Sequence, residues 1–373
     1  MVRFPFDPIR CGPKRRSPIV TEPMPSLSRL SPSDSALPRR IAVTLAALAV
    51  FQATRWIALP GVDMTALPAL GGLERVSLGS LGLGPWLTAV ILAEFAMLVW
   101  PRLRALTGDA PSAIPGNGGI VVGALILAGL QGAGLANALE DVAGVVRDPG
   151  APFRLGVALS FVATTAFYVW LARLVDRHGL RHGFWILLAA PHAWSVAAVL
   201  ASGEATAIQI AALAGFLALC AAVLGWLSRA APALTHGDEA LFAIVLGHAA
   251  ANWILGGAIL ALWLATGDSN LAQTPGFMSS ALLLPLVTLP AIALLRGRSL
   301  ALAQGLPFDV KRCGLLALAL GGLTGVGVLL MAFGLVSNAR ALLLLAAAGT
   351  LVALEIRAAA PLSPMPQDSQ SGA

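Results

Sequence analysis

Beyond residue 40, almost every stretch of this chain is apolar over a length that could cross a lipid bilayer. A membrane-spanning helix needs about 20 such residues. Only 11% of the residues are charged, whereas a soluble globular protein carries about 25%. The apolar runs therefore predict an all-α polytopic membrane protein.

These runs predict about ten transmembrane helices. Several separators between them are very short, so neighbouring helices are expected to form antiparallel hairpins. The predicted spans are residues 41–58, 80–100, 119–139, 155–175, 183–201, 206–228, 240–265, 279–295, 313–335 and 339–356. They divide the chain into two pseudo-symmetric five-helix halves, residues 39–201 and 202–357.

The segments outside the spans predict the orientation of the chain. Residues 1–38 are rich in Pro, Ser and Arg, and we expect them and residues 358–373 to be disordered tails. Most of the 24 Lys and Arg residues fall on the side of the membrane that holds the N-terminus. Since positive segments stay in the cytoplasm, both termini are expected there. The basic charge is thus a topology signal and does not indicate nucleic-acid binding.

One predicted span begins irregularly and carries a charge. The stretch LGLGPWLTAVILAEF, residues 81–95, opens with Gly82, Gly84 and Pro85, which predict a helix break. It also holds the carboxylate of Glu94. Because an isolated carboxylate is costly in a bilayer, Glu94 is expected to face protein or water and to have a partner. The alternative is a position near the cytoplasmic interface, where it would reach headgroup water.

Catalytic and metal-site motifs are not evident. The chain has no H-E-x-x-H, G-x-S-x-G or P-loop pattern, and its three cysteines fit neither a disulfide framework nor a zinc site. His178 and His182 with Asp176 form at most a weak metal half-site. We therefore expect no enzyme activity and no cofactor.

Three blocks, in this order, resemble the SecY family, the channel subunit of the general protein translocase. They are IALPGVD at 57–63, GGLERVSLGSLGLGPWLTAVILAEF at 71–95 and TTAFYVWLARLVDRHGLRHGFWILLAA at 164–190. The resemblance extends over roughly residues 39–200, whereas the second half is similar in span count and orientation only. It implies a protein-conducting channel in a bacterial inner membrane, with translocation or membrane insertion of polypeptides through a central pore.

The resemblance also implies roles for particular residues. A ring of bulky aliphatic side chains gates such a pore by dewetting. Two ring positions of the second span correspond to Leu83 and Leu87, and two of the fifth correspond to Phe184 and Leu188. The family opens sideways to lipid at a lateral gate between its helices. The candidates for that lateral gate are Glu94, Gln131, His248 and Asn252, with His248 as a candidate partner of Glu94.

The chain also departs from the family pattern. The segment MTALPAL, residues 64–70, is too short for the family's plug helix. The loops around 229–239 and 296–312 are short where the family binds the ribosome or the ATPase SecA, which weighs against such docking. Polypeptide clients and SecE-like and SecG-like subunits remain the partners that the resemblance implies.

Two other functions stay open. A small-solute transporter also uses broken helices, but its site needs several polar groups that converge near mid-membrane. Here Gln52, Gln131, His248 and Asn252 look scattered along the sequence. A non-conducting scaffold derived from a SecY-like channel would explain the lost docking loops.

Overall fold

The computed structural model describes residues 36–63, 65, 76–104, 117–230, 238–266, 275–304 and 308–359. Most of the two predicted tails and most of segment 64–70 lie outside these residues.

Within the described residues the chain is all-α, as predicted. Ten α-helices overlap the ten predicted spans: α1 (Ala36–Ala53), α2 (Gly84–Val99), α4 (Gly118–Glu140), α5 (Ala151–His178), α6 (Gly183–Ser202), α7 (Ala207–Ala230), α8 (Asp238–Thr266), α9 (Pro275–Gln304), α10 (Val310–Ala332) and α11 (Ala339–Ala359). The eight from α4 to α11 are long and apolar enough to cross a membrane. Helix α2 is apolar but has only 16 residues.

The second predicted span starts later than its apolar run. Gly82 adopts a positive φ of 51°, Leu83 caps α2, and Pro85 lies in the first turn of the helix. Proline is tolerated there because its missing N–H would have no helical partner. The chain before this turn is irregular but hydrogen-bonded, with Leu59 N–H donating to the Val76 carbonyl at 2.9 Å.

The loop after α1 is also held by local bonds. The short 3₁₀ helix η1 (Thr54–Trp56) ends α1, and Asp63 N–H donates to the Val145 carbonyl at 2.8 Å. The backbone N–H and the hydroxyl of Thr65 donate to the Asp63 carboxylate at 2.9 and 2.8 Å. These two bonds hold the pKa of Asp63 below its usual value.

Helices α1, α4, α5 and α6 pack together in the N-terminal part of the chain. At the crossing of α4 and α5, a Cβ on Gly132 would approach Phe161 Cδ2 to 2.8 Å and Ala158 Cα to 3.0 Å. Only glycine permits this spacing. The hydroxyls of Tyr168 and Thr54 are hydrogen-bonded and tie α5 to η1.

Helices α7 to α11 form the C-terminal group, and α8 and α9 cross closely within it. A Cβ on Gly247 would lie 2.7 Å from Leu289 Cα. The Thr288 hydroxyl donates to the Gly247 carbonyl at 2.8 Å, so the close crossing also carries a hydrogen bond between the helices.

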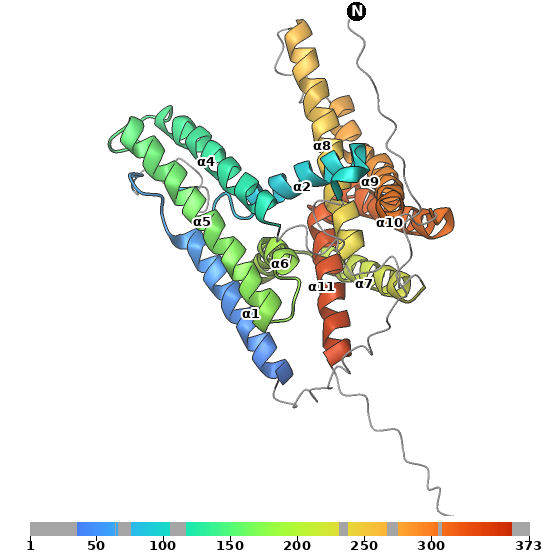
Figure 1. Cartoon of the computed structure of the whole chain (residues 1–373). Helices are drawn as coiled ribbons and strands as arrows, with labels where there is room; N and C mark the ends of the chain where they lie inside the picture. Colours follow the sequence, from blue (N-terminus) through green and yellow to red (C-terminus); the bar gives the residue numbers. More distant parts are fainter. Residues whose placement is uncertain are drawn as a thin grey trace, which may run out of the picture.

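Helix α2 bridges the two groups. It contacts α4 on one side and α8 and α9 on the other, and Figure 1 shows it between α4 and the α8–α9 pair. Helix α11 contacts α6, which makes a second connection between the groups. The positions of α2 and α11 therefore determine where the two halves of the chain meet.

Candidate functional site

The four predicted ring residues belong to one apolar cluster. Leu83 and Phe184 are buried in it, and Leu87 and Leu188 pack against it as partly buried residues. Their role as a pore ring stays a prediction, but the fold brings the two helices that carry them into one region.

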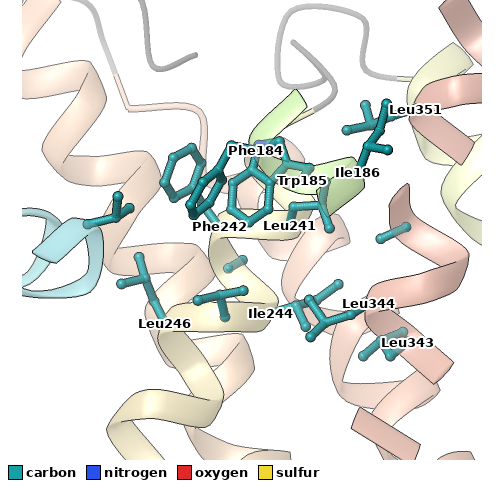
Figure 2. Packing of buried hydrophobic residues seen from close by; sticks show 14 of the residues in the cluster. Phe184, Trp185, Ile186, Leu241, Phe242, Ile244, Leu246, Leu343, Leu344 and Leu351 are labelled. Carbon is teal, nitrogen blue, oxygen red and sulfur yellow. The ribbon is translucent and has the colours of Figure 1, made fainter. Parts of the chain in front are cut away.

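The same cluster extends over all ten described helices, α8 and α11 among them. Helix α8 contributes Leu241 and Ile244, and α11 contributes Leu343 and Leu344. Figure 2 shows these side chains with those of Phe184 from α6. Within that cluster we call the side chains contributed by α2, α6, α8 and α11, most of them bulky, the apolar centre.

An unbroken row of aromatic rings runs through this centre. Trp86 of α2 meets Phe184 edge-on, with ring centroids 4.7 Å apart. Phe184 meets Trp185 at 4.9 Å, and Trp185 meets Phe242 of α8 at 4.8 Å with perpendicular planes. Figure 2 shows the last three rings together. Edge-to-face pairs of this kind contribute about 0.5–1.5 kcal/mol each beyond burial.

A buried ion cluster lies where α2 meets α9. The side chain of Glu94 is fully buried, and Arg296 of α9 binds both its oxygens, with Nε to Oε2 at 3.2 Å and Nη2 to Oε1 at 3.3 Å. Arg104 follows the 3₁₀ helix η4 (Pro101–Leu103) and donates from Nη2 to Oε2 at 3.0 Å. We call Glu94, Arg104 and Arg296 the charge cluster.

The charge cluster is joined to the aromatic row and to α2. The Arg296 guanidinium lies 4.3 Å from the centre of the Phe242 ring, a cation–π distance. One turn further along α9, the Ser299 hydroxyl donates to the Met97 carbonyl at 3.0 Å. These contacts connect α2, α8 and α9 without a break.

An aromatic pair extends the same contact surface toward the outside of the bundle. The rings of Phe95 on α2 and Trp253 on α8 lie 5.0 Å apart. Together with the charge cluster and the Ser299 bond, this pair defines what we call the seam, the contact of α2 with α8 and α9.

The four residues predicted for the lateral gate have different surroundings. Glu94 lies at the contact of α2 with α9, but its partners are arginines, so the expectation that it pairs with His248 is wrong. His248 Nδ1 contacts the carbonyl of Ile244 on its own helix at 2.8 Å. His248 and Asn252 line a cavity that α10 and α11 also line. Gln131 is half-buried on α4.

Sequence reasoning missed the two arginines. Both residues, Arg104 and Arg296, fall just outside the predicted spans 80–100 and 279–295, whereas their side chains are only 6% and 2% exposed. Helix α9 runs on to Gln304, so Arg296 lies well inside it. A buried carboxylate needs a cation nearby, and this requirement could have pointed to an arginine as the partner of Glu94.

A second and looser ion cluster joins the halves elsewhere. Glu355 near the end of α11 pairs with Arg40 of α1 at 3.4 Å and with Arg181, in the turn between α5 and α6, at 3.5 Å. The two arginines are 28% and 63% exposed, so water screens these pairs. In the described part of the chain no group of three or more His, Cys, Asp or Glu residues could hold a metal ion.

Comparison with known proteins supports a SecY-like relationship over part of the chain. The chain is 29% identical over 177 residues to the protein translocase subunit SecY of Buchnera aphidicola subsp. Acyrthosiphon pisum, a match that covers 42% of this chain and 40% of that protein. It is 28% identical over 176 residues to SecY of Escherichia coli K12, which covers 41% and 39%. For SecY of Vibrio cholerae the identity is 29% over 177 residues, with 41% and 39% covered.

The extent of these matches limits the relationship. No protein-family model matches the chain. The matched region spans about two fifths of the length of these curated relatives. Each relative is named as a translocase subunit, which agrees with a non-enzymatic membrane protein. The chain is therefore an all-α polytopic membrane protein with a distant, partial SecY-like relationship.

Proposed function

We propose that the chain forms a SecY-like path by which polypeptides cross or insert into a membrane. The observation that carries the proposal is the seam, where a buried carboxylate on α2 is bound by an arginine on α9, 202 positions further along the chain. The seam is the place where the two halves can part sideways. In this proposal the structure represents the protein with the seam closed.

In this proposal the apolar centre shared by α2, α6, α8 and α11 is the constriction. The lining residues that we propose on the α2 and α6 side are Leu83, Leu87, Phe184 and Leu188, the four positions that the resemblance implies. Ile244 and Leu344 are the further candidates from α8 and α11. A constriction of bulky apolar side chains excludes ions by dewetting and seals around a passing chain.

The seam serves as the lateral gate. We assign Glu94 to this lateral gate, as the resemblance implies. We add the other seam residues Arg104, Arg296, Phe95 and Trp253 to it. The row of rings from Trp86 to Phe242 connects the constriction to Arg296. Displacement of Phe184 by a passing chain would therefore disturb the contacts that hold the seam closed.

Orientation and partners belong to the same proposal. Both termini lie in the cytoplasm, and the protein resides in a bacterial inner membrane. Small SecE-like and SecG-like subunits are the assembly partners that we propose from the resemblance to the SecY family; the names of the relatives say only that each is a translocase subunit. The predicted loop at 296–312 is shorter still, because α9 continues to Gln304, and this leaves little surface for the ribosome or SecA.

Photocrosslinking of a stalled client tests the proposal. A photoreactive amino acid is placed at Leu87, and cells produce a ribosome-stalled membrane or secretory chain. The proposal predicts a crosslink between the two. Leu92 is the matched control, because it lies on the same helix and is 47% exposed on the bundle surface. It should crosslink to lipid and not to the stalled chain.

The other outcomes separate the alternatives. If Leu87 does not crosslink while the protein still co-purifies with translocase subunits, the scaffold replaces the channel. If neither a crosslink nor such a partner is found, the polypeptide path is refuted and a small-solute transporter becomes the better assignment.

A further inference from the structure

A partly open cavity with a mixed polar and apolar lining lies among the helices of the C-terminal group. Its volume is about 140 Å³, and residues of α7, α8, α9, α10 and α11 line it. Its polar lining residues are His248, Asn252, Thr324, Asn338 and Arg340. They come from three helices and the turn before α11, so the fold gathers groups that look scattered in the sequence.

The polar lining is rich in hydrogen-bond donors. Arg340 is half-buried, and within the described residues the structure gives it no carboxylate partner. The side-chain oxygen of Asn338 accepts from Ala341 N–H at 3.0 Å, so its amide nitrogen remains as a donor. Asn252 adds another amide. A guanidinium and two amides against a lining that contains no acidic residue among those described favour an anion.

The rest of the lining is apolar. Phe216, Val328 and Leu343 are among the residues that form it. An engineered cavity of about 150 Å³ binds benzene, so this one has room for about six non-hydrogen atoms. A ligand that fits both parts has a carboxylate at one end and a short hydrocarbon tail at the other.

We propose that this cavity binds a short-chain monocarboxylate of about four carbons, with the carboxylate on Arg340 and the tail among the apolar side chains. The Arg340 guanidinium has the planar fork that matches a carboxylate. Thr324 and His248 complete the polar part of the wall. The hydroxyl of Thr324 already donates to the Leu320 carbonyl at 2.7 Å, and His248 is oriented by the Ile244 carbonyl, so both side chains are fixed before a ligand arrives.

Saturation-transfer NMR on the full chain in phosphatidylcholine nanodiscs tests this site. Butyrate is the probe and butyramide its uncharged analogue. We expect signal transfer to butyrate and about tenfold weaker binding of butyramide, because the charge-assisted bonds to Arg340 are lost. This comparison uses the unmodified protein and so does not depend on the folding of a variant. Equal binding of the two compounds would overturn the proposal.

Variants identify the residue responsible. Arg340→Gln should weaken butyrate binding about tenfold or more, while Arg147→Gln, which removes an exposed loop arginine, should leave it unchanged. Unchanged binding in R340Q would place the ligand elsewhere. If chloride displaces butyrate at equal concentration, the site is a general anion site and the carboxylate assignment is wrong.

Discussion

Replacement of Glu94 by glutamine is the perturbation that the seam makes most informative. The carboxylate has 0% side-chain exposure and accepts three bonds of 3.0 to 3.3 Å from two guanidinium groups. Glutamine keeps the size but leaves both arginines without their buried counter-charge. Removing one partner of a buried ion pair costs about 3–5 kcal/mol. Because the pair joins α2 to α9, its loss should destabilise the closed seam relative to the open seam.

Such a cost corresponds to a change of about two to four orders of magnitude in the ratio of closed to open seam. The assay places single cysteines at Phe95 and Trp253, in a background without native cysteines, and measures their crosslinking by a short bismaleimide. E94Q should lower the crosslinking rate and yield, and should also lower the free energy of unfolding in detergent. Asp309→Asn is the control, because it removes a carboxylate that is 48% exposed and keeps an N-cap oxygen for α10.

A charge exchange separates this interaction from a general loss of packing. The variant Glu94→Arg with Arg296→Glu keeps opposite charges at the two positions and should recover part of the crosslinking that either single variant loses. The reasoning is refuted if E94Q changes neither the crosslinking nor the stability by more than D309N does. Equal damage in the single and exchanged variants would contradict a specific pair.

The other predictions concern packing, a buried hydroxyl pair and ion leak. Gly132→Ala should lower the free energy of unfolding by about 1–3 kcal/mol, because the added Cβ overpacks α4 against α5. Gly134→Ala is the control and should not lower it, because a Cβ added there meets open space. Equal melting temperatures for the two variants would contradict this prediction. Tyr168→Phe should lower the free energy of unfolding by about 0.5–1.5 kcal/mol, because its bond to the Thr54 hydroxyl is lost while that hydroxyl keeps its bond to the Phe51 carbonyl; an unchanged melting temperature would contradict this. Leu83→Ser and Leu87→Ser should raise ion leak through reconstituted vesicles, and unchanged leak in both would remove these residues from the ring.

The sequence predicted the fold class and the approximate positions of the helices well, but it predicted the residues at which the helices end less well. Apolar runs of bilayer length specify helices directly, and each of the ten predicted spans overlaps one described helix. Helix α9 was expected to stop at residue 295 but continues to Gln304. Arginine after a leucine-rich run resembles a loop signal, and only a carboxylate on another helix makes its burial favourable. That partner lies in a different part of the chain.

The sequence specified the need for a partner at Glu94 but not its identity. His248 was the wrong choice because helical spacing shows which residues share a face and not which neighbour the face meets. Helix α8 presents His248 and Asn252 to a cavity that α10 and α11 share, while Trp253 meets Phe95 of α2. The rotation of α8 is set by the close crossing at Gly247 and by the Thr288 bond, which arise only when α9 is in place.

Locking the seam tests the central claim most directly. The Phe95→Cys, Trp253→Cys protein is joined with the short bismaleimide before a stalled membrane-protein client is produced, and crosslinking from a photoreactive residue at Leu87 is measured. The account predicts that the locked protein loses the client crosslink, whereas protein treated with a monofunctional maleimide keeps it. Full client crosslinking with the seam locked would contradict the proposal that polypeptides use this seam.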